Sequence, residues 1–263
     1  MTTDKFSLRR MSMLADFYTP AILSQWLWMA PVTILCYLLS LLAAHGTPNY
    51  SLYAIVQVVL SLILCWGGLA FARYHDETVE TALPALASEK ALFMILYSLI
   101  AVPAGIYIVW LACRGITELA GFDSNFTEII QRQARSHFSD GLSSVDSKLG
   151  LLNYLGTALP MTVTLLTVVT ARRSRVFKGV IASVLGMIGL MLVGAVYGFA
   201  ISFMVVSKIP EGAPINESVL GNAFIEVINS TSTVTAIIGY SLALISLAVV
   251  LCMIFNRVKN RQV

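Results

Sequence analysis

The sequence predicts an all-α integral membrane protein with six transmembrane helices, both termini in the cytoplasm and a short cytoplasmic helix between spans two and three. Three observations predict this fold. The 263-residue chain is 57% hydrophobic and 12% charged, whereas soluble domains carry about 25% charged residues. Its mean hydropathy is +0.81, and its apolar residues gather in runs long enough to cross a bilayer. Lys and Arg concentrate between alternate runs, the pattern that sets orientation.

The apolar runs define the six predicted spans. They cover about residues 21–43, 51–72, 91–113, 151–171, 179–206 and 235–255. None contains a charged residue or a histidine, and each reaches the roughly 20 residues that a bilayer requires. The chain lacks the short alternating segments of a membrane β-barrel. The first run begins too late and is too long for a cleavable signal peptide, so we expect the mature protein to keep it.

The basic residues predict the orientation. Twelve of the 17 lie in the N-terminal segment, the two loops after spans two and four, and the tail. By the positive-inside rule these parts are cytoplasmic, which fits a bacterial inner membrane. Residues 1–20 then form a cytoplasmic amphipathic segment and residues 256–263 a basic cytoplasmic tail. The net charge of +3 is too small to indicate nucleic acid as a partner, so the expected surroundings are membrane lipid.

No motif for catalysis or cofactor binding is visible in the sequence. The four cysteines are widely spaced and the three histidines fall in three different loops, so we expect no metal site. The chain contains no phosphate-binding glycine loop, nucleophile elbow or HExxH motif. We therefore expect no enzyme activity and no cofactor in this chain. Gln25 and Gln57 are the most polar residues near the spans, which leaves no carboxylate for coupling to a proton or sodium gradient.

The most distinctive segment is residues 73–90, between spans two and three. It holds four of the 14 acidic residues on an otherwise basic side. Val79, Leu83 and Leu86 recur at helical spacing, and Ser88 is placed to cap the third span. A short amphipathic helix can simply lie in the membrane interface, but such helices are usually basic. The acidic character favours a docking element for a protein.

This segment resembles the loop between spans two and three of the six-helix permease subunits of exporter-type ATP-binding cassette (ABC) transporters, in a version similar to Bacteroidota-type permeases. Thr78-Val79-Glu80 is similar to the Thr-Leu-Glu element of that loop, Leu83-Pro84 to its Leu-Pro element, and Ser88-Glu89-Lys90 to its polar stretch before the next span. The sequence departs from the pattern at Glu77, where the family often has Gly, and Pro84 comes about two residues early.

The resemblance implies both a function and a set of partners. The chain would be the permease subunit that forms the substrate pathway, and the segment would be a coupling helix docking on a separate cytoplasmic ABC ATPase. ATP and Mg²⁺ would bind that partner, and two permeases would pair as a homodimer or as a heterodimer with a related chain. The residues that the resemblance assigns to docking are His75, Asp76, Glu77, Thr78, Glu80, Leu83, Pro84 and Glu89.

The fifth predicted span carries a face of small residues. Gly194, Gly198 and Ser202 follow one another at intervals of four, and such faces let helix backbones approach closely. Two readings remain open, contact with another helix of the same chain and contact with a second subunit.

A second function class also fits the sequence. A non-transporting membrane scaffold, sensor or assembly factor would equally lack charged residues in its spans, and the acidic segment would then dock another cytoplasmic protein. A membrane enzyme ranks third, because no His, Asp or Cys residues converge near one face.

Overall fold

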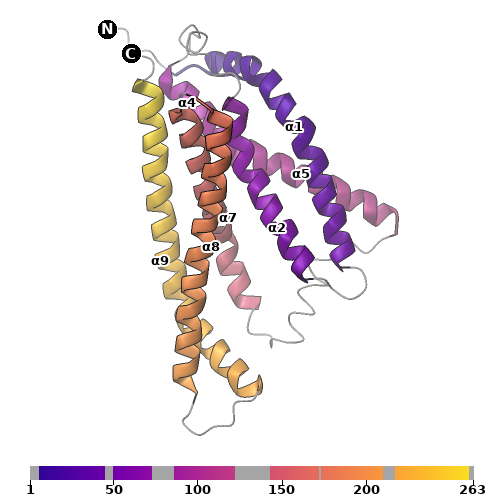
Figure 1. The fold of residues 1–263 in the computed structure, drawn as a ribbon, viewed down its shortest axis with the longest axis vertical. Coiled ribbons are helices and arrows are strands. Elements are labelled where there is room, and N and C mark those ends of the chain that lie inside the picture. The colour runs from indigo at the N-terminus through magenta and orange to yellow at the C-terminus, as the bar shows by residue number, and fades with distance from the viewer. Residues whose placement is uncertain are drawn as a thin grey trace.

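A computed structural model describes residues 6–44, 50–72, 86–121, 143–171, 173–209 and 217–260, and its regular elements are all helices (Figure 1). The α-helices are α1 (Leu8–Ala44), α2 (Tyr50–Cys65), α4 (Ala87–Leu96), α5 (Val102–Leu119), α7 (Ser143–Thr170), α8 (Arg175–Lys208) and α9 (Glu217–Asn260). Two short elements interrupt this pattern. A 3₁₀ helix, η1 (Trp66–Ala72), continues α2, and a π-helix, η2 (Tyr97–Ala101), joins α4 to α5.

Among the described residues, five helices are long and apolar enough to cross a bilayer, so the protein is an integral membrane protein. They are Leu8–Ala43, Ala54–Ala72, Ala87–Leu119, Arg175–Lys208 and Ile237–Lys259. The fourth predicted span, 151–171, coincides with the second part of α7 except for its last residue, and the described apolar part of α7, Gly156–Thr170, is shorter than a full span. Five of the six predicted spans therefore have a counterpart of sufficient length, and the fourth span stays a prediction.

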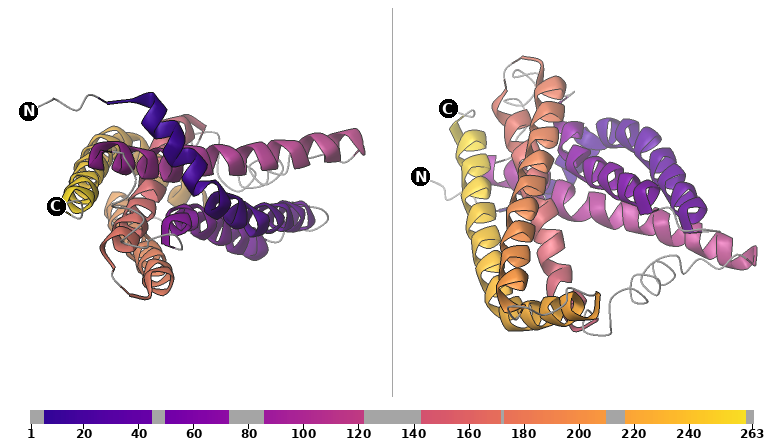
Figure 2. Two further views of the ribbon diagram at one scale, coloured as in Figure 1. Left: turned by 90° about the horizontal axis from the view of Figure 1, so that it is seen from above. Right: turned by 60° about the horizontal axis from the view of Figure 1, so that its bottom comes forward.

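The helices form a bundle in which the third span connects two groups. Helix α7 packs against α8, α9 and η1, while α1 and α2 pack against each other. Elements α4, η2 and α5 follow one line across the molecule (Figure 2). Its first part, α4, packs against α9, and its last part, α5, packs against α1. This line of helix thus touches both groups, and α2 with η1 also packs against α7 and α8.

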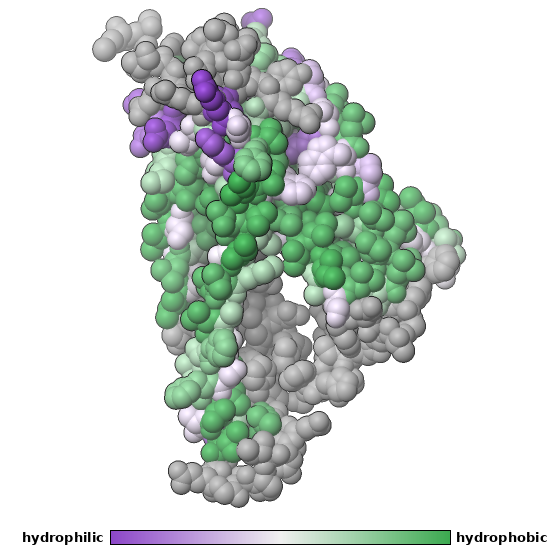
Figure 3. Space-filling model, in the orientation of Figure 1, coloured by the Kyte–Doolittle hydropathy of each residue, from purple (hydrophilic) through white to green (hydrophobic). Residues whose placement is uncertain are grey.

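The starts of α1 and α8 and the end of α9 lie at the same end of the bundle, which we call the basic end (Figure 1). Hydrophilic residues gather there and hydrophobic ones cover the flanks below it (Figure 3). The helix bounds place several basic residues at this end, namely Arg9, Arg10, Arg175, Lys178, Arg257 and Lys259. The basic residues that alternate along the sequence therefore gather at one end of the folded bundle. Which side of the membrane this end faces stays a prediction.

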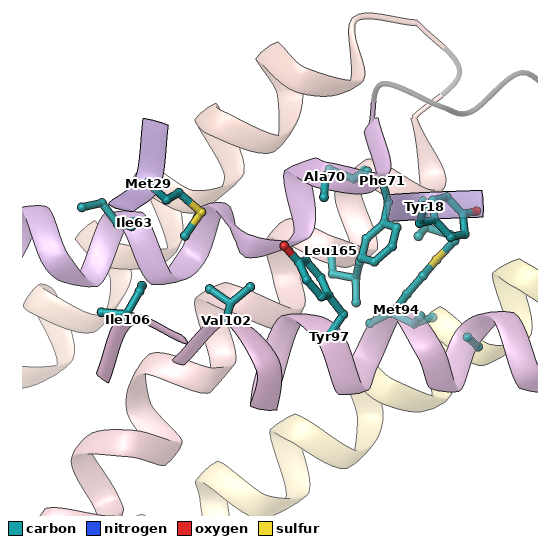
Figure 4. Close-up of a cluster of buried hydrophobic side chains, with 14 of the residues drawn as sticks. Tyr18, Met29, Ile63, Ala70, Phe71, Met94, Tyr97, Val102, Ile106 and Leu165 are labelled. Carbon is teal, nitrogen blue, oxygen red and sulfur yellow. The ribbon is translucent and has the colours of Figure 1, made fainter. Parts of the chain in front are cut away.

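Helix α1 is continuous across residue 20, where we expected an amphipathic segment to end and a span to begin. The reason is that one face of α1 is buried along its whole length. Leu14, Tyr18 and Met29 are at most 1% exposed, and the helical spacing between them brings them to the same side. Tyr18 lies against Phe71 of η1 with ring centroids 5.1 Å apart, in an edge-to-face arrangement (Figure 4).

The two elements that are not α-helical each follow from residues in the sequence. Pro103 has no backbone N–H, and immediately before it the N–H of Val102 bonds the carbonyl of Tyr97, a π-type contact. In η1, a Cβ on Gly67 would lie 3.0 Å from the Val102 side chain, and one on Gly68 would lie 3.2 Å from the Leu165 backbone. The glycine pair therefore lets η1 approach the neighbouring helices closely.

Candidate functional site

Most of the residues predicted to dock an ATPase lie outside the part of the chain that the structure describes. This holds for His75, Asp76, Glu77, Thr78, Glu80, Leu83 and Pro84, which fall in the undescribed range 73–85. Glu89 is described, and it follows this range closely as a member of the first turn of α4. The site is therefore built from Glu89 and from the contacts that continue away from it.

The Glu89 carboxylate is buried, with 0% exposure, and it accepts hydrogen bonds from two separate parts of the chain. From the start of α1, Arg10 donates through Nε at 3.0 and 3.1 Å and through Nη2 at 2.9 Å. The backbone N–H of Ser7 donates at 2.8 Å, and that of Leu86 donates at 3.0 Å. Bidentate bonds between a guanidinium and a carboxylate fix geometry as well as charge. We call Ser7, Arg10, Leu86 and Glu89 the Glu89 clasp.

The clasp corrects the expectation that Ser88 caps the third span. Helix α4 begins at Ala87, so Ser88 lies inside the helix and Leu86 occupies the N-cap position without a capping side chain. Glu89, three residues after the N-cap, instead reaches back to the Leu86 N–H. This is the acidic half of a capping box, and a carboxylate is also favoured by the helix dipole at this position.

The Glu89 carboxylate thus accepts its hydrogen bonds from Ser7, Arg10 and Leu86 of the same chain. The Glu89 side chain is fully buried, and it holds the start of α4 against the start of α1. Its place in the docking surface stays a prediction. The structure adds a role that the sequence did not suggest, because Arg10 and Glu89 are 79 residues apart.

A second polar cluster lies further along the same two helices. Gln25 is 4% exposed, and its side-chain Nε2 donates to the backbone carbonyls of Trp66 at 2.7 Å and Gly67 at 3.2 Å. Its Oε1 accepts a hydrogen bond from the Tyr97 hydroxyl at 2.9 Å. The Tyr97 side chain points from η2 toward η1 (Figure 4). We call Gln25, Trp66, Gly67 and Tyr97 the Gln25 joint.

The Gln25 joint sits where two helices leave α-helical geometry. Trp66 and Gly67 begin η1, and Tyr97 begins η2. Short 3₁₀ and π segments inside helices are frequent at hinges and functional sites. The cluster extends to α8, because the Trp66 indole N–H donates to the Ser183 hydroxyl at 2.9 Å. The joint therefore ties together spans one, two, three and five in the apolar part of the molecule.

This arrangement positions helices and offers no reactive group. The joint consists of an amide, a phenol and backbone carbonyls, none of which changes charge at neutral pH. Across the described ranges, no three His, Cys, Asp or Glu side chains gather as metal ligands would. What the site does in this structure is to join helices through hydrogen bonds.

The small-residue face of α8 is open among the described residues. A Cβ placed on Gly194 or Gly198 would find no heavy atom within 4 Å. Ser202 is exposed, and its hydroxyl bonds the Gly198 carbonyl of its own helix at 2.9 Å. By contrast, Gly186 nearer the basic end lies close to Pro160 of α7. The described part of the chain therefore supplies no neighbour for this face, and the prediction of a subunit interface stays open.

Comparison with protein-family models, with curated proteins and with solved structures finds no match to this chain. The functional conclusion therefore rests on the residues and their contacts.

Proposed function

We propose that this chain is the transmembrane permease subunit of an exporter-type ABC transporter in a bacterial inner membrane. It forms the pathway of an exported substrate and couples to a separate cytoplasmic ATPase subunit through residues 73–90. The ATPase binds ATP and Mg²⁺, and this chain supplies the moving helices.

The observation that supports this proposal is the position of the Glu89 clasp. The segment that resembles a coupling helix leads directly into α4, and the first turn of α4 is tied to the start of α1 by Arg10 and Glu89. A force applied to residues 73–85 would be carried into α1 as well as α4. A chain that couples an ATPase to its membrane helices needs such a connection.

The Gln25 joint extends the same route into the membrane. When ATP closes the partner ATPases, the coupling segment moves with them and takes α4 and the start of α1 along. Gln25 and Tyr97 join the same two helices further along and add η1 to the moving part. The π and 3₁₀ segments are the places where these spans can bend, because their hydrogen-bond ladders are already interrupted.

The first prediction concerns the partner. Purification of the tagged chain from its native host in a mild detergent should recover a stoichiometric ATPase with a Walker motif, identified by mass spectrometry. Deletion of Thr78–Pro84, or Glu80→Ala, should reduce the recovered ATPase and uncouple its activity from transport, while membrane insertion is unchanged. Glu118→Ala is a matched control, because Glu118 is an exposed acidic residue at the far end of α5.

Two outcomes would overturn the proposal. Recovery of the chain alone, or with a partner that is not an ATPase, would favour the scaffold, sensor or assembly-factor function. Unchanged coupling in the Thr78–Pro84 deletion would remove the docking role of the segment.

A second prediction concerns pairing. We propose that two copies, or this chain and a related one, pair through spans one and five, with the Gly194–Gly198–Ser202 face of α8 in the contact. Gly198→Leu should weaken the dimer in liposomes about tenfold, roughly 1.4 kcal/mol, because the bulky side chain separates the helix backbones. The monomer should not be destabilised, since a Cβ at Gly198 meets no heavy atom of the described chain within 4 Å. The readout is the crosslinked dimer fraction.

The matched control for pairing is Ala200→Leu. Ala200 is also exposed on α8, but two residues along a helix place it on nearly the opposite side from Gly198. Equal dimer fractions for the two variants would contradict the interface.

A further inference from the structure

A cavity opens beside the Gln25 joint, between α1, η1 and the first turns of α8. Its volume is about 330 Å³, at the lower end of the range for ligand pockets. Ala21, Gln25 and Ala70 form its buried floor, each at most 4% exposed. The half-buried rings of Trp28 and Trp66 stand at its rim. The volume suits one linear arm of a larger ligand.

The polar side-chain groups of Gln25 and Trp66, two of the residues that line the cavity, are already engaged within the protein. Both amide hydrogens of Gln25 are directed at backbone carbonyls, and its oxygen accepts from Tyr97. The Trp66 N–H donates to Ser183. A polar guest would therefore lose its hydrogen bonds to water without gaining equivalent ones, whereas a hydrocarbon guest would lose none. The lining selects for an apolar ligand.

The surroundings of the cavity identify the hydrocarbon. On the α8 side the rim is Val176, which is 44% exposed, and its neighbour Phe177 is 67% exposed. Both lie in the first turn of α8, a helix that is long and apolar enough to cross the bilayer. The rim therefore opens at the edge of the bilayer, where the acyl chains of lipids begin. Arg173 and Lys178 are exposed near the start of α8, at the level where cations attract lipid head groups.

We propose that this cavity binds one acyl chain of a membrane phospholipid. The bound chain would lie against Gln25 and Trp66, and would therefore stabilise the Gln25 joint in the geometry described here. A ligand that binds only the folded state raises stability in proportion to its occupancy. This inference does not depend on the proposed transport function, because it concerns the purified chain alone.

The test uses the two tryptophans at the rim as reporters. The chain has four tryptophans, and bromine atoms on an acyl chain quench tryptophan fluorescence on contact. The full chain is reconstituted in vesicles of dioleoyl phosphatidylcholine or of its dibrominated analogue. Ala21→Leu fills the cavity from α1 and Val180→Phe fills it from α8, so a folding defect in one leaves the other as the test. Ala112→Leu is the matched control, an exposed alanine on α5.

The expected result is that both filled variants lose the part of the quenching that comes from Trp28 and Trp66, whereas Ala112→Leu is quenched like the unmodified chain. In detergent, added dioleoyl phosphatidylcholine should raise the melting temperature of the unmodified chain and of Ala112→Leu, and this rise should disappear in both filled variants. Equal quenching and equal lipid-induced shifts in all four proteins would overturn the proposal. Failure to recover an ATPase would leave this result unaffected, so the two proposals are tested separately.

Discussion

Arg10→Met is expected to destabilise the protein by about 1.5–3 kcal/mol, because it removes the charge-assisted hydrogen bonds of the buried Glu89 carboxylate, which keeps only backbone donors. Glu89→Gln should cost less. The amide oxygen can still accept hydrogen bonds, and the Arg10 side chain, which is 26% exposed, can be hydrated once its partner is neutral. The order of the two effects follows from the unequal burial of the two partners and not from the strength of their bond.

The measurement is the unfolding midpoint in SDS or the melting temperature in detergent, for each single variant and for the double variant. The double variant should lose less stability than the sum of the single losses, since both remove the same contact. Arg9→Met is the control, because Arg9 is the exposed neighbour of Arg10, and a surface change of this kind usually shifts stability by about 0.5 kcal/mol or less. A larger loss for Glu89→Gln than for Arg10→Met would show that the clasp is held by Glu89 capping α4.

Candidate membrane spans can be found in the sequence because an apolar run is a local property. An apolar run of about 20 residues reports contact with lipid, and five such runs have helices of sufficient length. Helix ends are less predictable, because hydrogen bonding and packing continue a helix after the apolar run stops. Helix α1 begins at Leu8 and α9 at Glu217, both well before the apolar runs in them. In α1 the extension is explained by Leu14 and Tyr18, which pack in the same core as the span itself.

The candidate site is less predictable because its contacts join residues far apart in sequence. Gln25 stands out in the sequence by its polarity, but its acceptors are main-chain carbonyls 41 and 42 residues away. No pattern of side chains in a sequence predicts a hydrogen bond to a distant main-chain carbonyl. Pro103 and the Gly67-Gly68 pair were the available signals for the π and 3₁₀ segments. At Glu89, charge and position suggested docking, while the N3 spacing from Leu86 was the overlooked signal for a cap.

Gln25→Leu is the second change from which we expect a large effect. Leucine has a similar volume but removes the hydrogen bonds to Trp66, Gly67 and Tyr97. Hydrogen bonds between membrane helices contribute about 0.6–1.7 kcal/mol each, so the loss should be about 2–5 kcal/mol. Tyr97→Phe removes one of these bonds and should cost about 0.6–1.7 kcal/mol. Both are measured as shifts of the SDS unfolding midpoint.

Thr33→Val distinguishes the joint from buried polarity in general. Thr33 is buried on the same helix, but its hydroxyl donates to the Met29 carbonyl of its own turn and not to another helix of the described chain. Valine preserves its shape, and the carbonyl keeps its place in the helix, so the expected loss is close to zero. If Gln25→Leu proved as mild as Thr33→Val, the amide would not be holding η1 and η2 together. A loss confined to Gln25→Leu and Tyr97→Phe would instead mean that spans one, two and three are joined where their helices can bend, as coupled movement of these spans requires.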